Sequence, residues 1–358
     1  MKDKTQNIFI DGHKLMYHVD EVSKWLNNKI VAPIYIEIGP INSCNHKCTF
    51  CALDYIKSKG IVLDKDVLIK NLKDMAEFGV KSIMFAGEGE PLMHKDLPEI
   101  IENAKSFGLD IAITTNGVLL DKDKSSLILK NISWIKFSVD AGTKKTYSKI
   151  HGCKEEDFEK LLENIEFACK YKKENNLSCR IGCQILLIPS NIEEVKELIF
   201  KVKDIGIDYL VLKPYSQHPH SVNKIVLNIK KYDEELTKLS KKYSTDDFNV
   251  VYRNISAKEV GREEIDYEKC YGINFFELID ALGNVFPCNI FYEKEEYYYG
   301  NINKNKFSEI WKSTQRENVV KKLYKEGCSN CRKGCRLNFI NKYLDILKNK
   351  KIEHINFI

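Results

Sequence analysis

Short apolar runs alternate with longer amphipathic segments between residues 34 and 213. The apolar runs are nearly continuous, as expected for parallel strands covered on both faces, and they lie at 34–38, 82–87, 109–115, 134–140, 180–188 and 209–213. Between them, residues 64–79 and 156–175 carry apolar side chains at helical spacing. Six strand–helix repeats predict an α/β fold with a parallel sheet and right-handed crossovers. The pattern alone fits both an open partial barrel and a doubly wound sheet.

The segments on either side of these repeats follow other patterns. Residues 1–33 predict an N-terminal helical extension with one amphipathic helix over 18–29. Residues 214–268 are less regular and predict a bridge that contains a helix near 231–242. We therefore expect the repeated unit to occupy 34–213, with a boundary at each end.

The chain from 269 to 358 predicts a separate α+β extension. Residues 275–288 read as a β-hairpin that turns at 282–284, where glycine and asparagine favour a tight turn. A helix over 307–327 follows and ends in a glycine, as helices often do. A cysteine-rich segment at 328–335 leads into a last helix over 336–350.

Composition and charge limit the class of protein. The chain has 358 residues, 43% hydrophobic and 30% charged, which is ordinary for a globular protein and suits one large domain with a small one. The net charge of +5 is spread among mixed charges, so nucleic acid is not an expected partner. No apolar run is long enough to span a membrane, and the N-terminus lacks an apolar secretory region. These features predict a cytoplasmic protein.

Twelve cysteines are many for such a chain, and in a reducing compartment they favour metal or redox chemistry over disulfides. Eight of them fall into two groups: Cys44, Cys48 and Cys51 near the start, and Cys270, Cys288, Cys328, Cys331 and Cys335 in the last quarter. The remaining four are scattered and are interpreted mainly as small buried apolar residues.

The first group follows the first strand directly, at Cys-x3-Cys-x2-Cys spacing. Active sites gather at this end of parallel strands, and closely spaced thiolates suit iron–sulfur ligation. Structural zinc is the alternative, but it needs a fourth ligand, and His46 lies between two of the cysteines on a very short loop. Three cysteines on a four-iron cluster leave one iron open for a substrate or cofactor.

These residues resemble the radical SAM superfamily, whose members carry the same motif after the first strand of a six-fold β/α unit. The resemblance implies a partial (β/α)6 barrel and a [4Fe–4S] cluster on Cys44, Cys48 and Cys51, with S-adenosylmethionine (SAM) on the fourth iron. It implies reductive cleavage of SAM to a 5′-deoxyadenosyl radical that abstracts hydrogen from substrate. It also implies an external one-electron donor of the flavodoxin or ferredoxin type.

Further stretches resemble the superfamily's SAM-contacting motifs at successive strand ends. "GEP" in AGEGEP (86–91) resembles a motif that contacts the methionine amino group, although Glu88 stands where that motif has its first glycine. TTNG (114–117) and FSVDAG (137–142) end the third and fourth strands. The resemblance implies SAM contacts for Phe50, Gly89, Glu90, Pro91, Asn116, Ser138, Asp140 and Gln184.

The second group of cysteines resembles the SPASM/twitch extensions of the same superfamily. Five cysteines are too few for the two clusters of a full SPASM module, so their number favours one auxiliary [4Fe–4S] cluster. The simplest ligand set is Cys270, Cys288, Cys328 and Cys331, a layout similar to that of radical SAM dehydrogenases. Cys335 either replaces one of the last two or is a spare thiol, and a zinc site of four thiolates is the alternative reading.

The leading functional hypothesis is oxidation, or a related radical rearrangement, of a hydroxylated small molecule such as a sugar or aminocyclitol. Removal of a carbinol hydrogen leaves a radical that needs an electron acceptor, and a second cluster supplies one. The first alternative is a peptide-modifying maturase that forms thioethers, epimers or formylglycine, although only 33 residues precede the first strand to bind a leader peptide. The second is a non-catalytic iron–sulfur scaffold or sensor.

Substrate-binding residues are expected in KPYSQHPHS (213–221), which follows the sixth strand and offers hydrogen-bonding groups. Lys213 and His218 are candidate bases for a substrate hydroxyl, and Arg253 suits a phosphate or carboxylate. Cys183 and Cys153 are candidate hydrogen-atom donors, with a buried structural thiol as the alternative for both.

Overall fold

The computed structural model describes residues 13–57, 60–261, 265–349 and 353–357. Its strands are β1 (Tyr35–Ile38), β2 (Ser82–Phe85), β3 (Asp110–Thr115), β4 (Trp134–Ser138), β5 (Arg180–Leu187), β6 (Tyr209–Pro214), β7 (Asn249–Tyr252), β8 (Phe276–Ile279), β9 (Asn284–Phe286) and β10 (Gly300–Asn301). They form one sheet in the order β10-β9-β8-β1-β2-β3-β4-β5-β6-β7. The strands from β8 to β7 are parallel, whereas β9 and β10 add antiparallel pairs at one edge.

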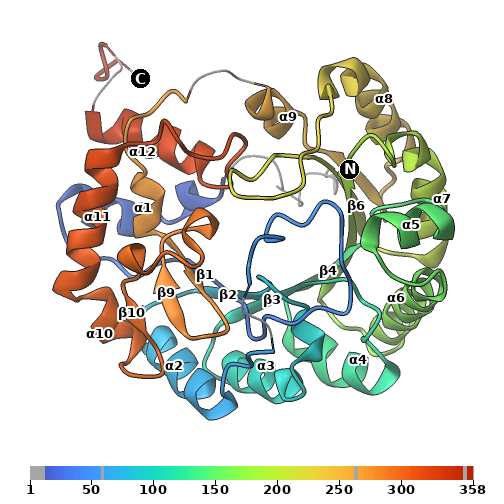
Figure 1. Cartoon of the computed structure of the whole chain (residues 1–358), viewed down its shortest axis with the longest axis horizontal. Coiled ribbons are helices and arrows are strands. Elements are labelled where there is room, and N and C mark those ends of the chain that lie inside the picture. The colour runs from blue at the N-terminus through green and yellow to red at the C-terminus, as the bar shows by residue number, and fades with distance from the viewer. Residues whose placement is uncertain (1–12, 58–59, 262–264, 350–352, 358) are drawn as a thin grey trace.

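Helices surround this curved sheet, as Figure 1 shows in a view down the barrel. They are α1 (Val19–Leu26), α2 (Lys65–Phe78), α3 (Leu97–Ser106), α4 (Lys122–Ile128), α5 (Lys144–His151), α6 (Glu156–Glu174), α7 (Val195–Ile205), α8 (Asp233–Tyr243), α9 (Asn254–Val260), α10 (Phe307–Trp311), α11 (Thr314–Glu326) and α12 (Asn338–Asn349). The helices after the β6 segment and the C-terminal elements close the ring on the side opposite α3 and α4 (Figure 1).

The sequence-based fold prediction is confirmed in its main features. The six predicted strands are β1 to β6, consecutive in a parallel sheet, and they form the predicted partial barrel. The predicted hairpin is β8–β9, whose turn is closed by a hydrogen bond from the Gly283 amide to the Asp280 carbonyl. The borders of the four predicted parts stay predictions, and residues 1–12 of the first part, like residue 350 of the last helix, lie outside the described residues.

Two features of the C-terminal half differ from the prediction. The bridge contains a seventh strand, β7, which pairs with β6, and β8 of the extension pairs in parallel with β1, so both segments enlarge the barrel sheet. The helix predicted over 307–327 is two helices, because Ser313 starts α11 by accepting a hydrogen bond from the Arg316 amide. A serine cap of this kind favours a new helix start over continuation.

Strand register decides which side chains enter the barrel. Lys136 on β4 is paired with Gly182 on β5, and Ser138 is paired with Gln184 one step further along. These positions face the interior, whereas the alternate residues Phe137 and Cys183 belong to the apolar core under the helices. The barrel interior is therefore lined by polar side chains at the carboxyl ends of the strands.

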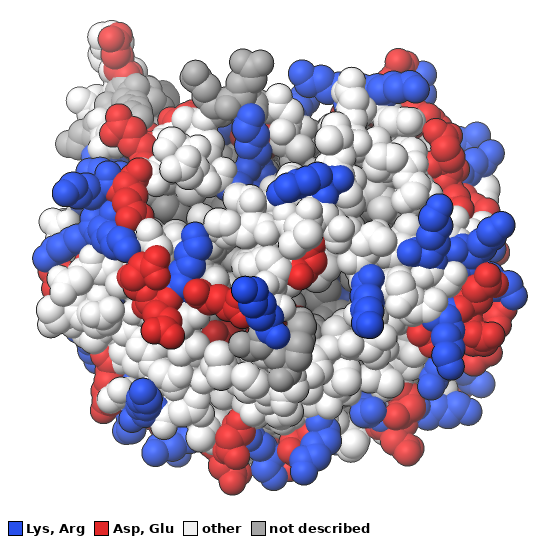
Figure 2. Space-filling model, viewed as in Figure 1, with Lys and Arg blue, Asp and Glu red and all other residues white. Residues whose placement is uncertain are grey.

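The surface carries interspersed charges. Figure 2 shows lysine and arginine side chains alternating with aspartate and glutamate around the rim of the face viewed, without a broad field of one sign. This agrees with the mixed charge expected from the sequence. Among the described residues, no helix is both long and apolar enough to cross a membrane.

Candidate active site

The loop between β1 and α2 carries the first cysteine group and lies over the barrel mouth, as the blue segment in Figure 1 shows. Hydrogen bonds hold both parts of this loop. The Gly39 amide donates to the Ile279 carbonyl at 2.8 Å, and the Lys47 and Thr49 amides donate to the carbonyls of His151 and Ile150 at 2.9 and 2.8 Å. The loop is thus fastened to β8 on one side and to the end of α5 on the other.

The three thiols of this loop lie close together. Cys44 is exposed, and Cys48 and Cys51 are partly buried. Burial, followed by the negative charges of Cys44 and Cys51, raises the pKa of the Cys48 thiol well above its usual value. None of the twelve cysteines, all within the described ranges, forms a disulfide. Three neighbouring thiolates repel one another unless a cation binds them, so this donor set fits an iron–sulfur cluster.

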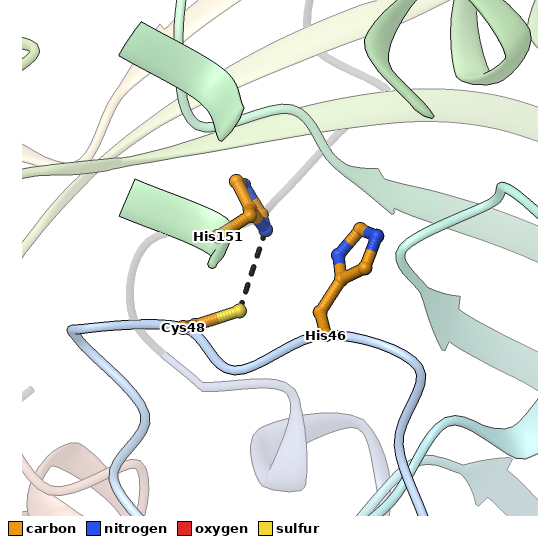
Figure 3. Close-up of side chains that lie close together, drawn as sticks. All are labelled: His46, Cys48 and His151. Atoms are coloured by element: carbon orange, nitrogen blue, oxygen red, sulfur yellow. Dashed lines mark hydrogen bonds between the residues drawn. The ribbon is translucent and has the colours of Figure 1, made fainter. Parts of the chain in front are cut away.

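Two histidines lie behind Cys48, as Figure 3 shows. The Cys48 Sγ is 3.3 Å from His151 Nδ1, and the His151 Nε2 is 3.3 Å from Asp140 Oδ2. His46 Nε2 is 3.4 Å from Asp157 Oδ2, and burial lowers the pKa of His46 to about 4. His151 was not anticipated from the sequence, because only the fold brings α5 next to the cysteine loop.

His46, Cys48 and His151 offer ligand atoms within 4.8 Å of one another, the spacing of a metal site. A zinc ion there would take Cys48 away from the other two cysteines and would need a fourth ligand. The sequence spacing of the three cysteines favours the cluster, and His151 is then placed to donate a hydrogen bond to the Cys48 sulfur.

Asp140, a predicted SAM contact, uses both carboxylate oxygens inside the protein. Oδ1 accepts a hydrogen bond from the Leu186 amide at 2.5 Å, and Oδ2 faces His151. The side chain is only 2% exposed. This geometry holds the Asp140 carboxylate between the β5 backbone and His151, and its predicted contact with SAM stays a prediction.

The GEP segment supports the cysteine loop from below. The buried Glu90 carboxylate accepts hydrogen bonds from the Thr115 hydroxyl at 2.6 Å, the Asn116 amide at 2.8 Å and the Leu92 amide at 3.0 Å. It therefore joins the ends of β2 and β3. Asn116 in turn donates from Nδ2 to Asn45 Oδ1 at 2.7 Å, which connects the third strand end to the cysteine loop.

Gly89 sits where the GEP segment and the cysteine loop touch. A Cβ there would lie 2.3 Å from the Ile41 carbonyl oxygen and 2.5 Å from that of Ser43, both backbone atoms. We expect Gly89→Ala to displace the cysteine loop and to lower stability by about 2–3 kcal/mol, an overpacking cost. Gly261→Ala is a matched control, because Gly261 also lacks a positive φ and the nearest atom to a Cβ there is a flexible lysine carbon at 3.3 Å.

Both variants are to be compared by thermal unfolding and by iron content after anaerobic reconstitution. The control exchanges a glycine for alanine without backbone strain and without a close backbone contact, so it should unfold like wild type. Equal iron content in Gly89→Ala and wild type would contradict the expected displacement of the loop.

Glu88, where the sequence departs from the superfamily motif, connects the barrel to the extension. Its Oε1 accepts a hydrogen bond from the Ala281 amide at 2.8 Å, in the turn between β8 and β9. Burial raises the pKa of Glu88 to about 8, so the carboxyl is largely protonated at neutral pH. The motif's first glycine is thus replaced by a side chain that fastens the hairpin to β2.

This raised pKa makes stability depend on pH. Because the pKa of folded Glu88 lies above its reference value of 4.5, its contribution is present below about pH 4.5 and is lost as pH rises through about 8. We expect Glu88→Gln, which stays neutral, to become more stable than wild type as pH rises from 5 to 9. Chemical unfolding at several pH values measures this difference, and parallel stability curves for the two proteins would contradict it.

The other predicted SAM-contacting residues lie around the same loop. The Phe50 ring packs edge-on against His151 with 5.2 Å between centroids. Pro91 begins a short 3-10 turn after Glu90. Ser138 and Gln184 are paired in register and partly exposed to the barrel interior.

The second cysteine group converges in the extension. Cys328 lies within hydrogen-bonding distance of Cys270 and Cys331, and their interaction affects the pKa values of both Cys328 and Cys331. Burial, followed by the charges of Cys335, Cys270 and Cys331, raises the pKa of the Cys288 thiol. Asn341 on α12 donates from Nδ2 to Cys270 Sγ at 3.3 Å. Five thiols from three segments thus surround one place, and this donor set fits a cluster.

The candidate catalytic residues are placed differently from one another. His218 is fully buried, stacked on Tyr55 with 5.4 Å between ring centroids, and its Nε2 is 3.3 Å from the Asn289 carbonyl oxygen. Burial lowers the pKa of His218 to about 4. Lys213 faces the barrel interior, where burial and neighbouring cations hold its pKa well below the usual value.

The two candidate thiol donors lie away from the interior. Cys183 is fully buried on the helix-facing side of β5, where its charged form would meet that of Cys169 on α6. Cys153 follows α5, and its Sγ is 3.5 Å from the Lys154 carbonyl oxygen. The position of Cys183 therefore supports a structural role for this buried thiol over a role as hydrogen-atom donor.

The sequence analysis also missed one interior cation. Lys136 reaches into the barrel from β4, and burial together with the charges of Arg253 and Arg336 lowers its pKa to about 8. The signal was a single lysine inside the otherwise apolar run 134–140. Burying a lysine ammonium group costs free energy unless a ligand or another protein group pairs with its charge.

Two family models match this chain. Residues 38–202 match the model of the radical SAM superfamily, and residues 270–335 match the SPASM model, described as an iron–sulfur cluster-binding domain. The chain therefore belongs to the radical SAM superfamily. Within it, the chain is an enzyme of the SPASM/twitch subgroup, with a SAM-binding [4Fe–4S] cluster and an auxiliary iron–sulfur domain.

Curated relatives share part of this chain. A probable GTP 3′,8-cyclase of Methanococcus vannielii is 30% identical over 212 residues, which are 57% of this chain and 66% of the relative. A GTP 3′,8-cyclase of Chlorobaculum tepidum is 29% identical over 190 residues, 51% of this chain and 55% of the relative. The chain thus spans less than two thirds of the length of these relatives.

Solved structures share the fold. SuiB of Streptococcus suis bound to S-adenosylmethionine has a TM-score of 0.66 at 18% identity, covering 86% of this chain and 72% of SuiB. The protein anSMEcpe with bound AdoMet has a TM-score of 0.60 at 19% identity, covering 89% of this chain and 97% of that protein. At these identities the likeness concerns the fold alone.

Proposed function

We propose that this enzyme abstracts hydrogen from a hydroxylated small molecule of the sugar or aminocyclitol type, in a dehydrogenation or a related radical rearrangement. The observation that carries the proposal is the pairing of a three-thiol loop at the barrel mouth with a separate five-thiol group in the extension. When bound, the first cluster supplies the electron that cleaves SAM to a 5′-deoxyadenosyl radical, and the auxiliary cluster supplies an electron acceptor.

In this proposal Cys44, Cys48 and Cys51 hold the first cluster, and His151 stabilises the Cys48 thiolate through its Nδ1. Phe50, Gly89, Asn116, Ser138 and Gln184 bind SAM at the strand ends. Glu90, Pro91 and Asp140 act beneath them by holding the loop and the histidine in place. The buried hydrogen bonds of the Glu90 and Asp140 carboxylates support these roles, because they fix both side chains to neighbouring strand ends.

Cys270, Cys288, Cys328 and Cys331 are the proposed ligands of one auxiliary [4Fe–4S] cluster. The contacts of Cys328 with Cys270 and Cys331 support these three as ligands. Cys288 is the fourth proposed ligand, because it interacts electrostatically with Cys270 and Cys331. Cys335 is the spare thiol in this assignment and lies on the barrel side of the group, where it lines a cavity with Cys288.

Lys213 and His218 are the proposed acceptors of the substrate hydroxyl proton. Burial lowers the pKa of each side chain and so favours its neutral form. A neutral amine or imidazole near the operating pH can take up a proton as the carbinol carbon is oxidised. Lys213 is the stronger candidate, since its side chain faces the interior whereas His218 is stacked beneath Tyr55.

The curated relatives are named for a reaction on GTP, a nucleotide whose ribose carries hydroxyl groups. An external one-electron donor of the flavodoxin or ferredoxin type is part of the proposal, because reductive cleavage consumes one electron for each SAM.

Substrate class is tested by supplying the reduced, reconstituted enzyme with deuterated sugars and aminocyclitols in one series and deuterated peptides in another. The proposal expects deuterium in 5′-deoxyadenosine from the first series, detected by mass spectrometry. Transfer only from a peptide would replace it by the peptide-maturase function.

A further inference from the structure

Cationic side chains converge inside the barrel beyond the groups already assigned. Lys136 and Lys213 face the interior from β4 and β6. After burial, the charge of Lys136 lowers the pKa of Lys213, and the charges of Arg253 and Arg336 lower the pKa of both lysines. Arg253 directly follows β7, and its amide donates to the Leu212 carbonyl at 3.1 Å, which places it beside Lys213. Arg332 and Arg336 enter from the cysteine-rich segment of the extension.

Four of these cations line a single cavity. Its volume of about 90 Å³ is three times the ~30 Å³ that one water molecule occupies in the liquid, so one tetrahedral anion fits. Its polar lining consists mainly of hydrogen-bond donors: Lys213, Arg253, Arg332, Arg336, Ser216, Ser256 and Asn289. Cys288 and Cys335 lie on the same wall, so a bound molecule would be next to the auxiliary thiols.

The protein neutralises only part of this charge. Glu37 forms an ion pair with Arg336, and Arg332 donates to the Ser216 hydroxyl at 2.9 Å. Both arginines directly follow cysteines of the second group, so thiolate charge accounts for them as well. Within the described ranges, Lys136 and Lys213 form no ion pair with a carboxylate. Burying an unpaired ammonium group costs several kcal/mol, so an anion from outside the chain would relieve this cost.

We propose that this cavity binds a phosphate group of the substrate, with Lys213 and Arg253 as its principal ligands and Lys136 supporting them from deeper in the barrel. This inference rests on the proposed function and narrows it to phosphorylated substrates. It leaves His218 as the proton acceptor, because a bound phosphate keeps Lys213 charged. The lysine and arginine side chains of the cavity match the several oxygens and double charge of a phosphate better than they match the single charge of a carboxylate. A phosphate held there anchors the substrate between the auxiliary thiols and the strand ends.

The test measures binding to the reconstituted holoprotein by isothermal titration calorimetry with ribose 5-phosphate, ribose, glucuronate and glucose as probes. We expect ribose 5-phosphate to bind more tightly than ribose, and more tightly than glucuronate. Lys213→Met and Arg253→Met should each weaken ribose 5-phosphate binding by about tenfold or more, the loss expected for a hydrogen bond to a charged group. Lys70→Met, an exposed lysine on α2, is the matched control and should bind as wild type does.

Three results would overturn the inference: no preference for ribose 5-phosphate over ribose, tighter binding of glucuronate, or unchanged affinity in Lys213→Met. Iron analysis of each variant checks the rival explanation that the cations only balance cluster charge, which predicts iron loss without phosphate binding. If Lys213→Met fails to fold, Lys136→Met supplies the loss of charge, and Lys213→Arg should retain most of the binding.

SAM cleavage is to be measured in parallel on the same preparations. Cleavage without phosphate binding would defeat this inference alone. Phosphate binding without any SAM cleavage would defeat the proposed function alone.

Discussion

Replacing Cys48 by alanine is expected to abolish SAM cleavage and to remove about half of the iron, four atoms of about eight per chain if both clusters are cubanes. The reason is geometric: Cys48 is the middle cysteine of the three-thiol loop, is partly buried and contacts His151. Two remaining cysteines cannot hold a four-iron cluster at this place. Iron analysis and low-temperature electron paramagnetic resonance of the reduced protein measure the effect.

Cys169→Ser is a matched control for this experiment. Cys169 is a partly buried cysteine that packs against the core from α6, far along the chain from both groups. It should keep full iron content and full SAM cleavage. Full iron content in Cys48→Ala would show that the loop does not bind a cluster. A zinc site that includes His46 and His151 would then be favoured.

Replacing Cys328 by alanine is expected to remove the auxiliary iron, again about four atoms per chain, while leaving SAM cleavage without substrate largely intact. Cys328 contacts both Cys270 and Cys331, so its loss opens the centre of the group. Turnover of substrate should fall by at least about tenfold, because the electron acceptor is lost. Iron content and product formation in one preparation separate the two effects.

The neighbouring variant Cys335→Ser provides the control. In the proposed assignment Cys335 is the spare thiol, so this variant keeps the auxiliary iron. Full iron in Cys328→Ala together with iron loss in Cys335→Ser would reverse the assignment of these two residues and leave the rest of the account standing.

Local patterns were sufficient for much of the barrel. Strands β1 to β6 could be predicted because buried parallel strands are short apolar runs between amphipathic helices, a signal that lies within each segment. The three-cysteine spacing is equally local, and it led directly to the superfamily that the comparisons confirm.

The features that were missed depend on contacts between distant segments. The parallel pairing of β8 with β1 joins residues more than 230 positions apart, as the partnership of Tyr35 with Phe276 shows, and no sequence period encodes it. His151 meets Cys48 across 103 positions. In the sequence, Glu88 is only a departure from the first glycine of the motif. Its hydrogen bond with the Ala281 amide depends on the position of the β8–β9 hairpin, which the sequence does not show.

The interior cations are a second example of a feature that depends on contacts between distant segments. The sequence predicts Lys213 as a candidate base and Arg253 as a ligand for a phosphate or carboxylate. Their joint position follows from the pairing of β6 with β7, a strand that is not predicted from the sequence. Lys136 was overlooked because one lysine changes little in an apolar run. Charge accumulation in a cavity is a property of the fold.

The most direct test of the central claim is the formation of 5′-deoxyadenosine by the anaerobically reconstituted, chemically reduced enzyme incubated with SAM. The account predicts 5′-deoxyadenosine in amounts that depend on reductant, on SAM and on the presence of all three of Cys44, Cys48 and Cys51. Intact clusters with no 5′-deoxyadenosine under these conditions would contradict it and would favour a non-catalytic iron–sulfur protein.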